Sequence, residues 1–152
     1  SIADWVTENK VKLVVSIGGM AEPNRQDIEK PKVGAIASDE ETLKKLVDKG
    51  IQVLSEGYIV GPYAMIMRRC AERGVPAVTL LAQSFFNYPD PEAAAMAVLE
   101  LNKLLNLDIN VEELIARGEE IRLRARDIMR RTQEELKRME KGHEFATPPM
   151  YV

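Results

Sequence analysis

The residues that could carry out catalytic chemistry are few and far apart in this sequence. Gly18-Gly19 follows an apolar run, as a phosphate-binding loop would, but the flanking residues match neither the G-x-G-x-x-G pattern nor the P-loop pattern. A tight turn after a strand explains this pair better, because glycine adopts turn conformations without steric cost. Ser84 lacks the glycines of a G-x-S-x-G nucleophile elbow, and the single histidine, His143, lies far along the chain. The sequence therefore predicts no catalytic residue.

A metal site is also unsupported by the residue types. A structural zinc site uses about four nitrogen or sulfur ligands, and this chain has one cysteine and one histidine. Cys70 lies within an apolar helical pattern beside Ile66 and Met67, which favours burial as a small apolar group over reactivity. We expect no metal and no cofactor.

The last three residues, Met150, Tyr151 and Val152, form a short pattern with a binding mechanism. A terminal carboxylate can pair with a lysine in a pocket. The penultimate tyrosine supplies a rigid ring that fills a cleft and a hydroxyl that forms a hydrogen bond, and the preceding apolar residue packs at the rim. Because capture of a C-terminal carboxylate is a recurring recognition mode, we predict that these three residues bind a protein partner.

Composition sets the broad class of the protein. The chain has 152 residues, of which 45% are hydrophobic and 30% charged, so it can form a domain with its own core. The net charge of -3 argues against a nucleic-acid partner. No apolar run approaches the roughly 20 residues that span a bilayer, so we expect no membrane contact. A single cysteine cannot form an internal disulfide, which favours a reducing, cytoplasmic setting.

Apolar runs alternate with amphipathic segments along the first two thirds of the chain. This alternation predicts an α/β fold with a mostly parallel sheet flanked by helices. Two helix starts are specific: Ser38 and Glu41 fit a capping box, and Asp90 fits an N-cap followed by proline at the first helical position. The predicted strands cover residues 12–17, 33–37, 58–60 and 77–81, and the predicted helices cover 2–9, 39–49, 62–73 and 91–105.

A long helix is predicted from Val111 to about Lys141, ended by Gly142. Apolar or small residues recur on one side of it at spacings of three and four, which is a heptad-like stripe. Such a helix is too long and too charged for one small sheet to cover, so we expect part of the stripe to bury against another subunit; the alternative is a helix lying along its own domain. The predicted interface residues are Leu114, Ile121 and Ile128.

The charged residues of the long helix allow two interpretations. The arginine-rich stretch could hold an acidic partner. Alternation with Glu and Asp instead favours a solvated face with pairs four residues apart. The arginines are Arg122, Arg124, Arg126, Arg130 and Arg131, and the predicted pairs are 120–124, 127–131 and 134–138.

Four segments together resemble a known family. They are 57–61 (GYIVG), 74–81 (GVPAVTLL), 88–94 (YPDPEAA) and 104–109 (LLNLDI), the last followed by the charged helix. The chain is similar to the proteasome assembly chaperone family of the second-chaperone type, in its archaeal branch. The similarity covers most of the region from about Val11 to Arg131, and the Pro-Asp-Pro-Glu-Ala-Ala stretch is its most specific part.

The resemblance implies a nucleoside-phosphorylase-like α/β fold without a known catalytic site, a homo-oligomer, and binding to proteasome α-subunits. In the family the C-terminal hydrophobic-Tyr-any (HbYX) motif docks on the proteasome, and it maps here onto Met150, Tyr151 and Val152. The expected organisation is an α/β core over 1–109, a charged helix over 110–141 and a docking tail over 142–152. Family members usually carry more sequence before the first strand, so this chain is expected to lack N-terminal strands.

Three functions follow from these observations. The first is a non-enzymatic chaperone or activator that binds proteasome α-subunits. The second is an enzyme related to ATP-grasp ligases, since related sequences have been grouped with them; such an enzyme needs a lysine and several acidic residues that hold Mg²⁺, and the sequence shows no such set. The third is a structural oligomer without a proteasome contact. Removal of residues 150–152 followed by an α-subunit binding assay separates the first from the others.

Overall fold

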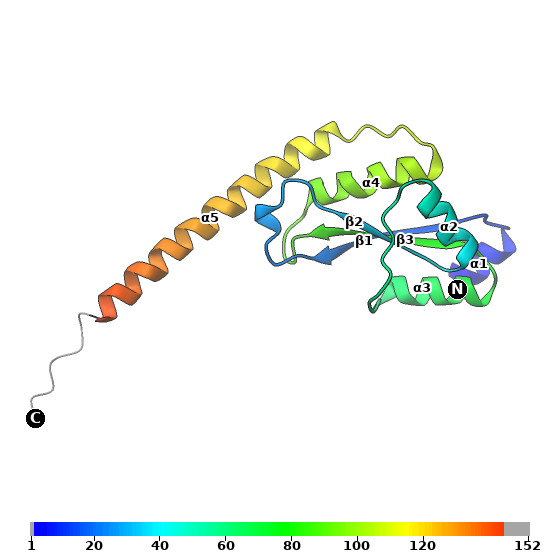
Figure 1. Cartoon of the computed structure of the whole chain (residues 1–152), viewed down its shortest axis with the longest axis horizontal. Coiled ribbons are helices and arrows are strands. Elements are labelled where there is room, and N and C mark those ends of the chain that lie inside the picture. The colour runs from blue at the N-terminus through cyan, green and yellow to red at the C-terminus, as the bar shows by residue number, and fades with distance from the viewer. Residues whose placement is uncertain (1, 145–152) are drawn as a thin grey trace, which may run out of the picture.

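A three-stranded sheet lies at the centre of the fold (Figure 1). The structure is a computed structural model that describes residues 2–144, with the side chains of residues 2 and 4–139. The strands are β1 (Val14–Ala21), β2 (Val33–Ala37) and β3 (Ala77–Ser84), in the order β1-β3-β2. The α/β class is confirmed. The sheet is mixed, because β1 pairs parallel with the central β3 whereas β2 pairs antiparallel with it.

The direction of β2 follows from the segment that precedes it. Residues 22–32 form only a short 3-10 helix, Arg25–Asp27, and contain Pro23 and Pro31. A parallel return needs a crossover of a dozen or more residues, usually a helix, that carries the chain back along the sheet. Without that helix the chain enters β2 at the end where β1 finished, so β2 runs antiparallel.

Helices cover both faces of the sheet. α1 (Ile2–Glu8) and α3 (Pro62–Glu72) lie on one face, and α2 (Glu40–Asp48) and α4 (Pro91–Leu105) cover the other (Figure 1). Successive side chains of β3 point to opposite faces, so Val78 and Leu80 pack in the cluster with α2 and α4 whereas Ala77 packs with α1 and α3. This double coverage explains why β3 reads as a continuous apolar run.

The two glycines at 18 and 19 lie inside β1, so the predicted turn after Ile17 is wrong. Their lack of a side chain serves close packing. A Cβ at Gly18 would lie 2.8 Å from the ring of Tyr63, and a Cβ at Gly19 would collide with the hydroxyl of Ser84 on the neighbouring strand. The strand continues to Ala21 because these positions pair with β3, and a larger residue at either glycine would require Tyr63 or Ser84 to move.

Residues 58–60 do not form the predicted strand. Instead Val53 makes an isolated parallel bridge to Ala35 of β2, and residues 58–60 run as an irregular segment before α3. Tyr58 is fully exposed and Val60 is 79% exposed. Aromatic and β-branched residues favour a half-buried pleated surface, but in the described part of the chain no neighbouring strand offers one to this segment.

The N-cap residue of α2 is Asp39 rather than the predicted Ser38, whereas the N-cap of α4 is Asp90 as predicted. Asp39 is the N-cap of α2, and the N–H of Thr42 donates to its carboxylate and lowers the pKa of that group. The hydroxyl of Ser38 instead accepts from the N–H of Ala77 at 2.8 Å and ties α2 to β3. Asp90 caps α4 as predicted, because its carboxylate accepts from Ala93 N–H at 3.0 Å.

The long helix α5 (Glu112–Glu144) begins against α4 and then leaves the rest of the fold (Figure 1). Its 33 residues correspond to a length of about 50 Å. Residues 130–139 are all exposed. Gly142 does not end the helix, because a glycine costs only about 1 kcal/mol in a helix and does not prevent one.

Gly118 sets how closely α5 approaches α4. A Cβ at this position would lie 2.5 Å from the backbone nitrogen of Glu92 and 2.8 Å from its Cα. Helix propensity alone predicts that Gly118→Ala stabilises the protein by about 1 kcal/mol. We expect the opposite sign, a net loss of up to about 2 kcal/mol, because α5 must shift away from a rigid backbone. Urea denaturation measures the difference.

The exposed change Ala116→Gly in the same helix calibrates the propensity contribution and should cost about 1 kcal/mol. A Gly118→Ala protein more stable than the wild type would show that α5 can move away from α4 at little cost in free energy.

Candidate functional site

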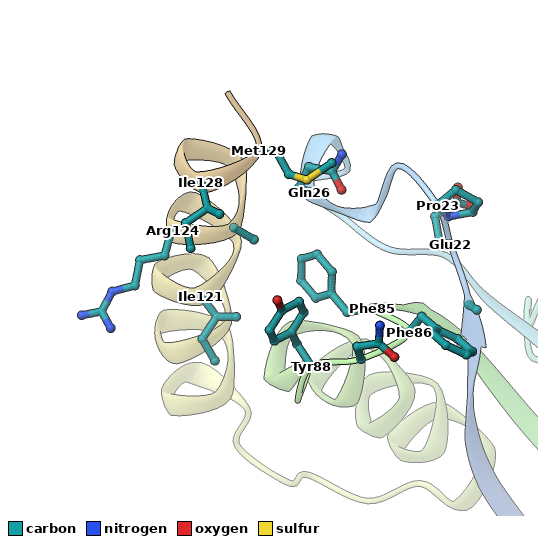
Figure 2. A pocket seen from close by; sticks show the side chains of 13 residues that line it. Glu22, Pro23, Gln26, Phe85, Phe86, Tyr88, Ile121, Arg124, Ile128 and Met129 are labelled. Carbon is teal, nitrogen blue, oxygen red and sulfur yellow. The ribbon is translucent and has the colours of Figure 1, made fainter. Parts of the chain in front are cut away.

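An apolar groove of about 540 Å³ lies beside α5, facing the segments that follow β1 and β3 (Figure 2). Large apolar side chains on its walls are exposed: Phe86 is 83%, Tyr88 66% and Ile128 62% accessible. Exposed apolar surface of this kind marks a site of interaction. The groove is lined by Ala21, Glu22, Pro23, Gln26, Phe85, Phe86, Asn87, Tyr88, Ile121, Arg124, Ala125, Ile128 and Met129.

Two of the three predicted interface residues meet in this groove. Ile121 and Ile128 form part of its α5 wall. Leu114, one heptad earlier, is half-buried and does not line it. The heptad spacing thus located the α5 wall, but it carried no information about the opposite wall. That wall comes from residues 85–88, whose two phenylalanines and one tyrosine were the available signal in the sequence.

The aromatic segment 85–88 connects β3 to α4 and is held by a ring contact within it and by the cap of α4. The rings of Phe85 and Tyr88 meet edge to face with centroids 6.3 Å apart, a favourable arrangement for aromatic pairs. The N–H of Phe85 donates to the carboxylate of Asp90 at 3.2 Å. Figure 2 shows Phe85 and Tyr88 on the side of the groove that faces α5. The cap of α4 therefore also positions the aromatic wall.

A buried ion network lies beside this wall, and its centre is Arg25. The side chain of Arg25 is 0% exposed. Its guanidinium donates to both carboxylate oxygens of Asp90, at 2.7 and 3.0 Å, to Glu92 at 2.8 Å, and to the carbonyl of Ile28 at 2.6 Å. Its guanidinium carbon also lies 5.3 Å from the ring centroid of Phe85, within the range of a cation–π contact.

The same network reaches α5. The Nε atom of Arg122 lies 3.3 Å from Glu92, an ion pair whose geometry does not make a hydrogen bond. Arg126 lies 3.5 Å from Asp27. Arg25 and Arg122 balance the charges of Asp90 and Glu92, so the buried group is neutral overall, as burial requires. These ion pairs join the segment after β1, the start of α4 and α5, which are the three parts that frame the groove.

Sequence reasoning missed Arg25, because its partners lie 65 and 67 residues away and no local spacing reports them. The arginine-rich stretch divides into two kinds of residue. Arg122 is buried, whereas Arg124 pairs with Glu120 at 2.5 Å and Arg131 with Asp127 at 2.8 Å on the exposed side, as predicted. The third predicted pair is wrong, since Arg138 contacts Glu135 rather than Glu134.

The other candidate sites considered from the sequence are a reactive cysteine, a metal site and the C-terminal motif. Cys70 is buried, as predicted, and burial raises the pKa of its thiol, which disfavours the reactive thiolate. Among the described side chains, those of residues 2 and 4–139, no cluster of three or more His, Cys, Asp or Glu could hold a metal ion. None of the described helices is long and apolar enough to cross a membrane. Met150, Tyr151 and Val152 lie outside the described residues.

Comparison with known proteins gives a consistent result. A model of the PAC2 family matches residues 1–129. The chain is 30% identical over 141 residues to an uncharacterized protein of Methanocaldococcus jannaschii, with 93% of this chain and 55% of that protein covered.

Solved structures agree with this match. Pyrococcus furiosus PbaA, described as an archaeal homolog of proteasome-assembly chaperone, superposes with a TM-score of 0.73 and 30% identity, over 99% of this chain and 61% of that one. P. furiosus PbaB, described as an archaeal proteasome activator, shares the fold with a TM-score of 0.70 and 24% identity, over 87% and 55% of the two chains. The chain thus spans between 55% and 61% of the length of these relatives.

Proposed function

Because the chain belongs to the PAC2 family, we propose that it is a proteasome assembly chaperone or activator that binds proteasome α-subunits through Met150, Tyr151 and Val152. The observation that carries this proposal is the family match over residues 1–129, together with the 30% identity to a homolog of proteasome-assembly chaperone. The protein acts by binding rather than by catalysis, and it needs no cofactor. The proposal requires a free carboxylate on Val152.

The length and exposure of α5 suggest separate roles for the core, the helix and the tail. The core (1–109) and the buried ion network hold the start of α5, and the exposed residues 130–139 extend away from that core (Figure 1). α5 therefore acts as an arm that carries the tail away from its own core, and it ends at Glu144 rather than at residue 141. The eight residues 145–152 could span at most about 29 Å if they were fully extended. This reach lets the tail enter a pocket on a ring surface near the end of α5.

The proposal is tested with isolated α-subunits. The whole chain, immobilised through a group on its core, should retain α-subunits, and the chain without residues 150–152 should not. Circular dichroism of the two proteins provides the control, because removal of three residues beyond α5 should leave the helical signal unchanged. Equal retention by both proteins would assign the binding to another surface.

Self-association through the α5 stripe is the second part of the proposal, with Leu114, Ile121 and Ile128 at the interface. Several tails on one oligomer would then act together through effective concentration, so that weak individual contacts give firm binding. The exposed apolar groove beside α5 is consistent with this arrangement, because a second subunit would cover it.

The double change Ile121→Glu and Ile128→Glu tests this interface. It places two carboxylates in an apolar contact, at a cost of several kcal/mol to association, so sedimentation should show smaller species. Leu123→Glu is the matched control: Leu123 is also exposed but points to the other side of α5, and the oligomer should persist. An unchanged oligomer in the double variant would exclude the stripe as the interface.

A further inference from the structure

The apolar stripe of α5 continues beyond the groove. Ile121 and Ile128 line the groove, whereas Leu136 and Met139 are 55% and 64% exposed on the part of α5 that extends past it. At 3.6 residues per turn, positions 121 and 139 are five full turns apart and share one side of the helix. The described chain thus has an apolar groove at one end of the stripe and uncovered apolar side chains at the other.

We propose that residues 129–139 of α5 in a second copy of this chain lie antiparallel along α5 and fill the groove. The relation is reciprocal, so each copy supplies one helix segment and one groove. The inference rests on the proposed self-association, and it adds the segment that occupies the groove and its direction. The groove walls on α5 and on segment 85–88 form the kind of surface into which an amphipathic helix docks.

In an antiparallel pair, the stripe positions of one α5 lie opposite stripe positions of the other. If two copies of α5 are related by a two-fold axis near residue 130, position 121 of one copy lies opposite 139 of the other, and position 128 lies opposite 132. Ile121 then meets Met139 of the second copy, and Ile128 meets Thr132. Such an isologous contact is the commonest form of homodimer interface.

The charges beside the stripe also fit the antiparallel direction. A two-fold axis perpendicular to the helices places the same flank of both copies side by side. Along that flank acidic and basic residues alternate, so reversal sets each acidic residue opposite a basic one. The resulting pairs across the two copies are Glu120 with Arg138, Arg124 with Glu135, and Asp127 with Arg131.

A parallel pair would lose this complementarity. Parallel helices in register bring opposite flanks together, and the other flank carries Met129, Leu136 and the buried Arg122 instead of partners for the charged residues. In the antiparallel pair the apolar flank faces the aromatic wall: Leu136 of the second copy comes level with Arg124 along the axis but lies on the opposite flank, toward segment 85–88. Figure 2 shows Arg124 pointing away from Tyr88. Both flanks therefore favour the antiparallel direction.

Cysteine cross-linking of the whole chain distinguishes the directions. Two variants, Ile121→Cys and Met139→Cys, are made separately and also co-expressed. After mild oxidation the co-expressed chains should form a species of twice the 17.1 kDa chain mass. Each variant alone should stay uncross-linked, because position 121 lies about 27 Å along the axis from position 121 of an antiparallel partner. The buried Cys70 should not react, and the wild-type chain verifies this.

A second co-expressed pair, Leu123→Cys with Lys137→Cys, serves as the matched control. These positions have the same register about residue 130 but lie on the opposite side of α5, so they should not cross-link. Cross-linking of Ile121→Cys with itself would show a parallel pair and overturn the inference. Absence of any cross-link would overturn it as well.

The result is separable from the proteasome proposal. A chain that binds α-subunits without the 121–139 cross-link would leave the tail function intact and reject the antiparallel pair. A chain that cross-links as expected but does not retain α-subunits would reject the tail function and keep the pair.

Discussion

Replacement of Arg25 by alanine is expected to reduce the free energy of unfolding by about 3–5 kcal/mol, the largest loss of stability that we predict for a single substitution. The change leaves the carboxylates of Asp90 and Glu92, both about 95% buried, without their main cationic partner. It also removes the anchor of the segment after β1 on α4. For a chain of this length the melting temperature should fall by roughly 10 °C, which calorimetry or thermal circular dichroism measures.

Two further variants separate charge from packing. Arg25→Met keeps most of the side-chain length but not the charge, so it should lose nearly as much stability as Arg25→Ala. Arg117→Ala breaks an exposed ion pair with Glu113 at 2.6 Å and should change the free energy of unfolding by less than about 0.5 kcal/mol. If Arg25→Ala were as stable as Arg117→Ala, the network would contribute nothing to the fold.

Tyr151→Ala is expected to abolish binding to α-subunits while the fold and the oligomer remain unchanged. The tyrosine ring is the anchor of the proposed docking motif, and buried aromatic anchors dominate the energy of small interfaces. Tyr151→Phe should cost less, since it keeps the ring and loses one hydrogen bond worth about 0.5–1.5 kcal/mol per tail. Calorimetry or surface plasmon resonance with isolated α-subunits gives the order wild type, Phe, Ala.

Addition of one residue after Val152 tests the carboxylate separately. The extension keeps Met150, Tyr151 and Val152 but moves the terminal charge out of register with a lysine in the pocket, so it should weaken binding as strongly as Tyr151→Ala. Full-strength binding of the extended chain would show that the terminal carboxylate is not recognised. Because the core and α5 are untouched by all three variants, their sedimentation and circular dichroism should match the wild type.

The sequence alone determined the features that depend on near neighbours in the chain. Asp90 and Pro91 predict the start of α4, because an N-cap contact joins residues only three positions apart. The spacing of three and four residues identified α5 and two residues of the groove wall, Ile121 and Ile128, because helical periodicity is local. The same reasoning indicated the burial of Cys70.

The features that the sequence did not reveal depend on distant partners. Residues 58–60 have strand-like composition, yet a strand needs a neighbour to pair with, and the described chain offers none there. The direction of β2 depended on the missing helix between β1 and β2 rather than on β2 itself. Ser38 and Asp39 could each cap α2, and the choice followed from the N–H of Ala77, which engages the Ser38 hydroxyl.

The groove beside α5 illustrates this division most clearly. Heptad spacing located its α5 wall from the sequence. Its other wall, segment 85–88, and the buried Arg25 that holds the surrounding parts together were settled only by the tertiary structure. From the sequence, Arg25 is an ordinary arginine in a loop. Its partners Asp90 and Glu92 lie 65 and 67 residues away, and only the fold brings them into contact with it. Local hydrogen bonds and helical periodicity depend on residues a few positions apart, so the sequence reveals them. The neutralisation of a buried charge depends on which distant segments the packed core brings together.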